Sequence, residues 1–493
     1  MRNVAVIDRV TGEPFPPDAP PPHILKLNPG DPARAADLRD ANVRLIDYFR
    51  AQSYPLVKAP LPEPTVDHDT QTMDVTFVVG FDPAIVRSFI YLQEGDPYSP
   101  KALADTKTSI ASIPAVGSVR IREADALDAD GRLPIFVDVA DRPRNLIGGV
   151  AGYSTVDGPS GNLYYENRNL FGGAESLRLD GAVFYAPPVY GITLNEYNSF
   201  TGPQNVNSRG LGGRATLSFM KPALNGSRVD FLFDAVAENF RSGGGVFGGY
   251  VDQLAGGTGA LRYRFDDKFS VQAGLKFEKG QATDALGRVN YQLFGVPLSL
   301  KFDNTDNLLN PSRGIRVTAA VTPYTAVFGG LGFTKASVTG SAYYALDEDA
   351  NYILAGRAGF GSIFGDPGGL PSIPANYRFY EGGLATIRGY RFQTVGPSTP
   401  LGYTIGGLSA FNATAEARIK VTDTIGVAPF FDIGGAYRNP LPFSGGGDTR
   451  MSFGCGAIYY TPIGPIRIDL ARPLNPRRGD YPVVAYISIG QPF

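Results

Sequence analysis

From about residue 145 to its end, the chain repeats one pattern, in which apolar and polar residues alternate along segments of roughly ten residues. Gly, Pro, Asn and Asp separate the segments, and the links between them are short and long in turn. An even number of strands with tight turns on one side and long loops on the other predicts a transmembrane antiparallel β-barrel. We count sixteen segments, which begin near residues 145, 161, 175, 211, 228, 257, 268, 289, 313, 332, 351, 411, 425, 449, 464 and 482.

The segment at residues 411–421 shows the two faces of such a strand. Its apolar positions are Ala413, Ala415, Ala417, Ile419 and Val421, and the residues between them are Asn412, Thr414, Glu416, Arg418 and Lys420. A closed sheet pairs every backbone group, which lets strands cross a bilayer with apolar residues outside and polar residues inside. The alternative is a soluble β-sandwich or propeller, and the alternating loop lengths argue against it. Sixteen strands enclose a lumen that side chains alone do not fill.

Composition excludes several classes of function. The net charge is −2, and no run of Lys or Arg offers a surface for nucleic acid. Cys455 is the single cysteine, and the two histidines, His23 and His68, both precede the barrel. We therefore expect no disulfide, no catalytic residues, no metal site and no cofactor, and hence no enzyme. By strand alternation Cys455 should face lipid.

The first 144 residues follow a different pattern. Helical spacing at residues 37–49, 82–92 and 99–113, with strands at 73–79 and 133–139, predicts the order strand, helix, helix, strand, strand, used twice. We expect an α+β module at 1–79, a second module at 80–144 whose first strand is missing or shared, and the barrel at 145–493. The start lacks the apolar stretch of a secretory signal. Either the protein is cytoplasmic or its natural N-terminus is missing.

The loop at residues 365–410 contains a short motif. Ile387-Arg388-Gly389-Tyr390 follows Phe379-Tyr380-Glu381-Gly382-Gly383, and the chain ends in Phe493. With the strand count, this resembles the BamA/TamA superfamily of outer-membrane assembly proteins. The resemblance implies that the loop folds into the lumen as a plug and that Arg388, of the (V/I)RG(F/Y) motif, tethers this plug by contacting acidic residues on the late strands. Glu416 and Asp432, the latter in Phe431-Asp432-Ile433-Gly434, match those acidic partners.

The same resemblance implies a function, and the TamA branch fits best. The N-terminal modules are expected to be POTRA modules in the periplasm, and the barrel is expected in the bacterial outer membrane. The expected partners are the lipid bilayer, unfolded barrel or autotransporter clients, and a TamB-like protein anchored in the inner membrane. The alternatives are a BamA-like general insertase, a two-partner secretion pore and a passive porin. The motif and the modules argue against the porin.

The expected site of client insertion is a seam between the first and last strands. Gly packs no side chain and Pro donates no ladder hydrogen bond, so both weaken strand pairing. The seam residues are expected to be Gly148, Gly149 and Gly152 on the first strand, and Gly490, Pro492 and Phe493 at the end of the last. An open seam exposes an edge on which a client strand can form.

Overall fold

The computed structural model describes most of the chain. The described residues are 3–8, 22–32, 34–51, 57–58, 61–62, 65–67, 72–81, 83–128, 131–154, 158–186, 210–241, 249–328, 330–365, 368–400, 402–444, 446–461, 464–477, 480–489 and 491. The chain divides into two compact units. One comprises Met1–Ile147, Tyr165–Arg178 and Ser218–Leu232, and the other comprises Gly148–Tyr164, Leu179–Leu217 and Phe233–Phe493.

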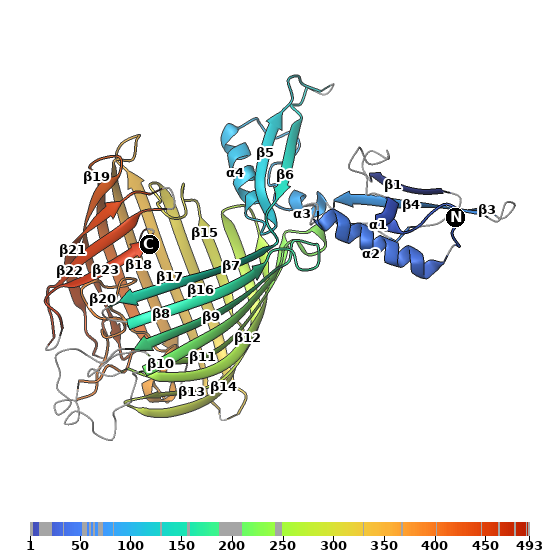
Figure 1. The fold of residues 1–493 in the computed structure, drawn as a ribbon. Coiled ribbons are helices and arrows are strands. Elements are labelled where there is room, and N and C mark those ends of the chain that lie inside the picture. The colour runs from blue at the N-terminus through green and yellow to red at the C-terminus, as the bar shows by residue number, and fades with distance from the viewer. Residues whose placement is uncertain are drawn as a thin grey trace. The chain divides into compact units, whose positions relative to one another are not determined.

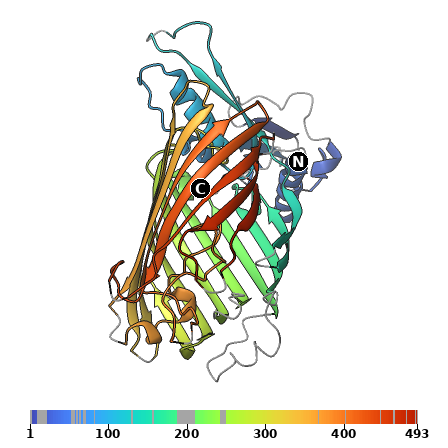
Figure 2. The ribbon, with the colours of Figure 1, turned by 90° about the vertical axis from the view of Figure 1, so that its left-hand side faces the viewer.

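Strands β7 to β23 form a closed barrel in which β23 lies beside β7 (Figure 1). The late strands, orange to red, form one continuous wall (Figure 2). The bounds are β7 Asn145–Ser154, β8 Gly158–Asn167, β9 Ser176–Ala186, β10 Gly210–Lys221, β11 Val229–Arg241, β12 Val251–Arg264, β13 Phe269–Asp284, β14 Gly287–Gly295, β15 Leu298–Asp303, β16 Gly314–Ala326, β17 Gly332–Ala345, β18 Tyr352–Phe364, β19 Ser409–Lys420, β20 Ile425–Tyr437, β21 Arg450–Tyr459, β22 Ile466–Pro473 and β23 Val484–Ile489. The mainly β, antiparallel barrel fold that the sequence predicts is confirmed.

The barrel has seventeen labelled strands, whereas the sequence predicts sixteen. The two numbers agree once β14 and β15 are counted as two halves of one strand. Gly295 of β14 pairs with Lys276 of β13, and Leu298 of β15 pairs with Ala273 of β13. The register therefore continues across the break without a shift. The break falls at Val296 and Pro297, where the proline has no N–H to donate to the ladder.

The barrel buries polar residues and exposes apolar ones. On β22, Arg467 and Asp469 are buried, whereas Ile468 is 48% exposed and Leu470 is 53% exposed. Cys455 on β21 is exposed as the alternation predicts. An apolar outer face and a polar inner face suit a wall between lipid and a lumen. No helix in the described ranges is long and apolar enough to cross a membrane.

The first N-terminal module is a small α+β fold. In chain order it contains β1 Asn3–Asp8, α1 Pro22–Leu25, α2 Ala35–Ala51, β2 Val57–Lys58, β3 Thr65–Asp67 and β4 Thr72–Phe81. The sheet order is β1-β4-β2, with β1 parallel to β4 and β3 also paired to β4. Helix α2 buries Leu38, Ala41 and Leu45, whose spacing of three and four residues puts them on one helix face.

The second module contains α3 Pro83–Arg87, α4 Pro100–Ala111, β5 Val116–Glu123 and β6 Ile135–Asp141. Its sheet has two strands among the described residues, β5 and β6. Helix α4 starts at the N-cap Ser99, whose hydroxyl accepts from the backbone N–H of Ala102. The prediction of a helix to residue 92 is wrong, because α3 ends at Arg87 and the hydroxyl of Ser88 donates to the carbonyl of Ile85.

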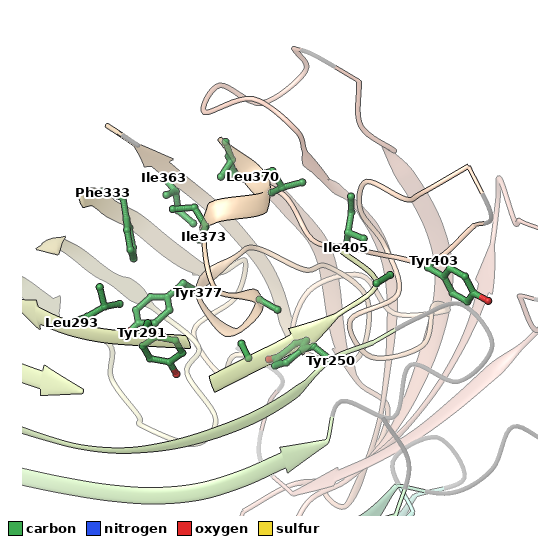
Figure 3. Packing of buried hydrophobic residues seen from close by; sticks show 14 residues of the cluster. Tyr250, Tyr291, Leu293, Phe333, Ile363, Leu370, Ile373, Tyr377, Tyr403 and Ile405 are labelled. Carbon is green, nitrogen blue, oxygen red and sulfur yellow. The ribbon is translucent and has the colours of Figure 1, made fainter. Parts of the chain in front are cut away.

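Two apolar clusters lie in different units. In the first unit, α3, α4 and β5 bury a cluster that includes Ile110, Ile113 and Val116, together with Ala174 and Ala223 from the turns before β9 and β11. In the second unit, the loop between β18 and β19 packs against barrel residues in an aromatic-rich cluster (Figure 3). The labelled members of that cluster are Tyr250, Tyr291, Leu293, Phe333, Ile363, Leu370, Ile373, Tyr377, Tyr403 and Ile405.

Candidate functional site in the barrel lumen

Arg388 lies buried against the late strands, where its guanidinium meets two carboxylates in the way the motif predicts. Its Nε and Nη2 donate to the two carboxylate oxygens of Asp432 on β20, at 2.8 and 2.9 Å. Its Nη1 donates to Glu416 Oε2 on β19 at 3.1 Å. The guanidinium also stacks on the ring of Phe430, with 3.3 Å between Cζ and the ring centroid. A planar fork with both carboxylate oxygens engaged fixes the orientation of the side chain.

The network around Arg388 is larger than the sequence predicts. Arg388 Nη1 also donates to Asp469 Oδ2 on β22, at 3.3 Å. Arg467, two residues before Asp469, donates to Glu416 Oε2 at 2.7 Å and to Asp469 Oδ1 at 2.6 Å. Arg418 Nε donates to Glu416 Oε1 at 2.8 Å. Three guanidinium groups thus face three carboxylates, and each of the six side chains is at most 2% exposed.

Equal numbers of opposite charges explain how this cluster tolerates burial. An unpaired ion costs several kcal/mol to remove from water, whereas paired and hydrogen-bonded ions offset much of that cost. Burial lowers the pKa of Arg388, but its bonds to Asp432 and the charges of Asp432, Glu416 and Asp469 outweigh that effect and raise the pKa above its ordinary value. The loop arginine is therefore a permanent cation that ties the loop to β19, β20 and β22.

The other motif residues hold Arg388 in place. Ile387 is fully buried with Tyr390 and Val395. Gly389 has φ +91°, and a Cβ there would lie 3.2 Å from Ser452 Cβ, so the position favours glycine on both backbone and space. The Gly389 N–H donates to the hydroxyl of Tyr486 on β23 at 3.0 Å, and that hydroxyl donates to the carbonyl of Tyr390 at 2.9 Å. The motif therefore contacts the last strand as well.

Tyr390 and Glu381 fix the two sides of the motif. The Tyr390 hydroxyl lies 2.9 Å from the carbonyl of Met451 and 2.9 Å from Asn475 Oδ1. Glu381 accepts hydrogen bonds from Asn412 Nδ2 at 3.1 and 3.3 Å. Burial raises the pKa of Glu381 to about 7, although hydrogen bonds from Asn412 and Thr386 and the charge of Arg357 partly lower it. Glu381 is thus a titratable group close to neutral pH inside the docked loop.

The structure brings together Arg388, Glu416 and Asp432 of the predicted site, and adds Arg418, Asp469 and Arg467. Of these three, Arg418 is on the polar face that the sequence already assigns. Asp469 and Arg467 carry the same signal, since they alternate with Ile466, Ile468 and Leu470 along β22. Alternation places such residues in the lumen, but it does not show which of them meet across four strands.

Of the predicted seam residues, Gly148, Gly149 and Gly152 lie on β7, whereas Gly490, Pro492 and Phe493 lie outside the described residues. Among the described residues β23 spans Val484–Ile489, and residue 490, which follows it, lies outside them. The ring of Tyr164 occupies the space where a Cβ on Gly148 would lie, so this position requires glycine.

The end of the last strand is linked to the ion network. Gln491 follows β23, and its side-chain oxygen accepts from Arg467 Nη1 at 3.0 Å. Its amide nitrogen donates to Asn310 Oδ1 at 2.9 Å, and its backbone N–H donates to the carbonyl of Leu309 at 3.1 Å. Leu309 and Asn310 belong to the turn between β15 and β16. Among the described residues no group of three or more His, Cys, Asp or Glu side chains is arranged to hold a metal ion.

Comparison with known proteins agrees with this architecture. The Omp85 superfamily domain matches residues 169–493. The chain is 24% identical over 430 residues to the outer membrane protein assembly factor BamA of Neorickettsia risticii, a match that covers 83% of this chain and 53% of that protein. It is 28% identical over 345 residues to BamA of Nitratidesulfovibrio vulgaris, covering 68% of this chain and 39% of that protein. The chain thus spans about half of these relatives or less.

The fold is also that of a solved structure. The crystal structure of BamA from Haemophilus ducreyi lacking POTRA domains 1–3 superposes with a TM-score of 0.60 at 17% identity, covering 94% of this chain and 95% of that one. This likeness shows the fold, and the family match extends over most of the barrel. This chain therefore belongs to the Omp85 superfamily and is a protein of the bacterial outer membrane.

Proposed function

We propose that this protein assembles other proteins into the outer membrane by opening the seam between β7 and β23. The observation that carries the proposal is the contact between the buried motif and both sides of the last hairpin. Arg388 binds Asp469 on β22, and the Gly389 N–H binds Tyr486 on β23. A loop that is fixed to the strands beside the seam can support them when that seam opens. The relatives named as outer-membrane protein assembly factors support the same function.

In this mechanism no covalent step occurs. A client's terminal strand pairs with the free edge of β7, as an edge strand pairs with any strand of matching register. Later client strands add by the same pairing, and the new barrel separates into lipid. The modules at residues 1–79 and 80–144 act as POTRA modules that receive extended clients in the periplasm by strand addition.

A disulfide across the seam tests this mechanism. In a Cys455→Ser background, Val150→Cys on β7 is combined in turn with Ala485→Cys or Ile487→Cys on β23, and the pair that oxidises completely is used. Oxidation should abolish insertion of a reporter barrel into proteoliposomes, and reduction should restore it. The matched control locks Val338 to Phe360, which are paired residues of β17 and β18. If the locked seam inserts clients as well as the control does, the seam mechanism is wrong.

The identity of the partner is the finer part of the proposal. We propose a TamA-like role with a large TamB-like protein anchored in the inner membrane; the competing role is that of a BamA-like general insertase. Crosslinked affinity purification from outer membranes, followed by mass spectrometry, separates the two. One very large inner-membrane partner supports the TamA-like role, whereas a set of small lipoproteins would assign the BamA-like role. Low and erratic conductance in planar bilayers, rather than steady conductance, separates both from a porin.

A further inference from the structure

The loop between β18 and β19 has a second buried anchor, ten residues before the motif. Three consecutive residues, Asn376, Tyr377 and Arg378, each donate a hydrogen bond to a different carboxylate of β12 or β13. The bonds are Asn376 Nδ2 to Asp252 Oδ2 at 3.1 Å, Tyr377 Oη to Glu278 Oε1 at 3.0 Å, and Arg378 Nη1 to Asp284 Oδ2 at 2.5 Å. The family motif does not include these residues.

Arg378 is the central group of this anchor. Its side chain is fully buried and that of Asp284 is 2% exposed. Arg378 Nε also donates to the carbonyl of Ile373 at 2.9 Å, and Nη1 donates to the carbonyl of Ile405 at 2.9 Å. One side chain therefore fixes both ends of the loop to each other and to β13. A charge-assisted bond between groups this buried is costly to break from one side only.

Aromatic packing strengthens the same attachment. The Tyr377 ring lies at the end of η4 (Ala375–Tyr377) and meets three barrel rings edge to face, with centroid distances of 5.8 Å to Tyr291, 5.0 Å to Tyr324 and 5.4 Å to Phe333. Figure 3 shows Tyr377 directed toward Tyr291, with Ile373 and Leu370 beside Phe333 and Ile363. Arrangements of this kind contribute beyond simple area burial.

The two anchors attach the loop to different stretches of the barrel wall. Arg378 binds β13, whereas Arg388 binds β19, β20 and β22, and strands β14 to β18 separate the two regions in the sheet order. The Arg388 region includes the neighbour of the seam strand β23. The Arg378 region includes no seam strand. The two anchors thus hold different strands, and only one of them is next to the seam.

We propose that Arg378 is a positioning residue that holds the loop as a plug of the lumen, independently of the motif at Arg388. The part of the loop held by Arg378, here called the Arg378 half, keeps the wide barrel closed to ions. The part held by Arg388, the Arg388 half, supports the late strands during client insertion. The inference rests on the proposed function for the second half only. Sixteen-stranded barrels without a plug are aqueous channels. Release of the Arg378 half should therefore be visible as ion conductance, independently of client insertion.

Planar-bilayer conductance and client insertion, measured on the same preparations, test the division. The variant is Arg378→Ala with Asp284→Asn, which removes both charges and leaves no unpaired carboxylate. We expect steady conductance at least tenfold above the wild-type level, with client insertion within twofold of wild type. The matched control is Arg313→Ala, an exposed arginine of the turn before β16, which should change neither reading.

A second variant, Arg388→Ala with Asp432→Asn, should show the converse: insertion falls at least tenfold while conductance stays near the wild-type level. Heat-modifiable migration on gels identifies folded barrels before either measurement, and Tyr377→Phe offers a milder release of the same anchor if the double variant does not fold. Wild-type conductance after loss of Arg378, or an open channel after loss of Arg388 alone, would overturn the inference. Absence of insertion by the wild-type protein would instead count against the proposed function and leave the conductance result to decide this one.

Discussion

Replacement of Arg388 by alanine should release the motif from the late strands. The native network contains three guanidinium groups and three carboxylates, and the substitution leaves two against three. The carboxylate of Asp432 loses both side-chain bonds and retains its bond from the Arg388 backbone N–H, at 3.0 Å. The result is one uncompensated negative charge in a site with almost no access to water.

The magnitude follows from the cost of leaving a buried charge unpaired. Removal of one partner from a buried ion pair costs about 3–5 kcal/mol. A loss of about 4 kcal/mol lowers the ratio of docked to released motif roughly a thousandfold. Arg388→Ala with Asp432→Asn leaves two charges of each sign, so the double variant should lose less than the single one. The difference measures the coupling between the two side chains.

Amide hydrogen exchange in the reconstituted protein measures this release directly. The reporters are the backbone N–H groups of Arg388 and Gly389, which donate to Asp432 Oδ2 and to the hydroxyl of Tyr486. Protection of such amides reports the free energy of local opening. Exchange in the single variant should rise by two to three orders of magnitude, or about 3–4 kcal/mol. A rise of less than tenfold, or faster exchange in the double variant than in the single one, would refute the reasoning.

Two further predictions concern the same loop. Burial raises the pKa of Glu381 from 4.5 to about 7 in the docked loop. Between these two pH values the docked loop holds a proton that the released loop has lost. Docking is therefore strongest at low pH, and it weakens by about 3 kcal/mol as the pH rises from 4.5 through 7. Limited proteolysis of the loop at pH 5.5 and 8 should show this difference in the wild type and not in Glu381→Gln; an equal difference in both would contradict it. Gly389→Ala combines an unfavourable φ with close contact to Ser452, and it should weaken motif docking by about 2 kcal/mol as measured by hydrogen exchange. The control is Gly402→Ala, which has φ +85° but no atom within 4 Å of the new Cβ, and it should cost less. Equal effects at Gly389 and Gly402 would exclude the steric part.

The sequence by itself determined the barrel and most of its strands. Alternation is a local property, because a strand with one face to lipid and one to the lumen must place apolar residues at every second position. It is read residue by residue along segments such as 411–421. Pro297 interrupts the hydrogen bonding between β14 and β15. The alternating pattern does not reveal this break, because the register is the same on both sides of it. The family motif added Arg388, Glu416 and Asp432.

Only the tertiary structure decided which lumenal charges meet. Glu416 and Arg467 are 51 residues apart, and Arg378 and Asp284 are 94 residues apart. Each pair depends on strand registers, barrel closure and the path of the loop, and alternation specifies none of these distances. A charged residue on the inner face of a strand has the same local pattern whether it faces water, a plug or another ion. The division of the loop between two anchors is therefore a property of the closed barrel.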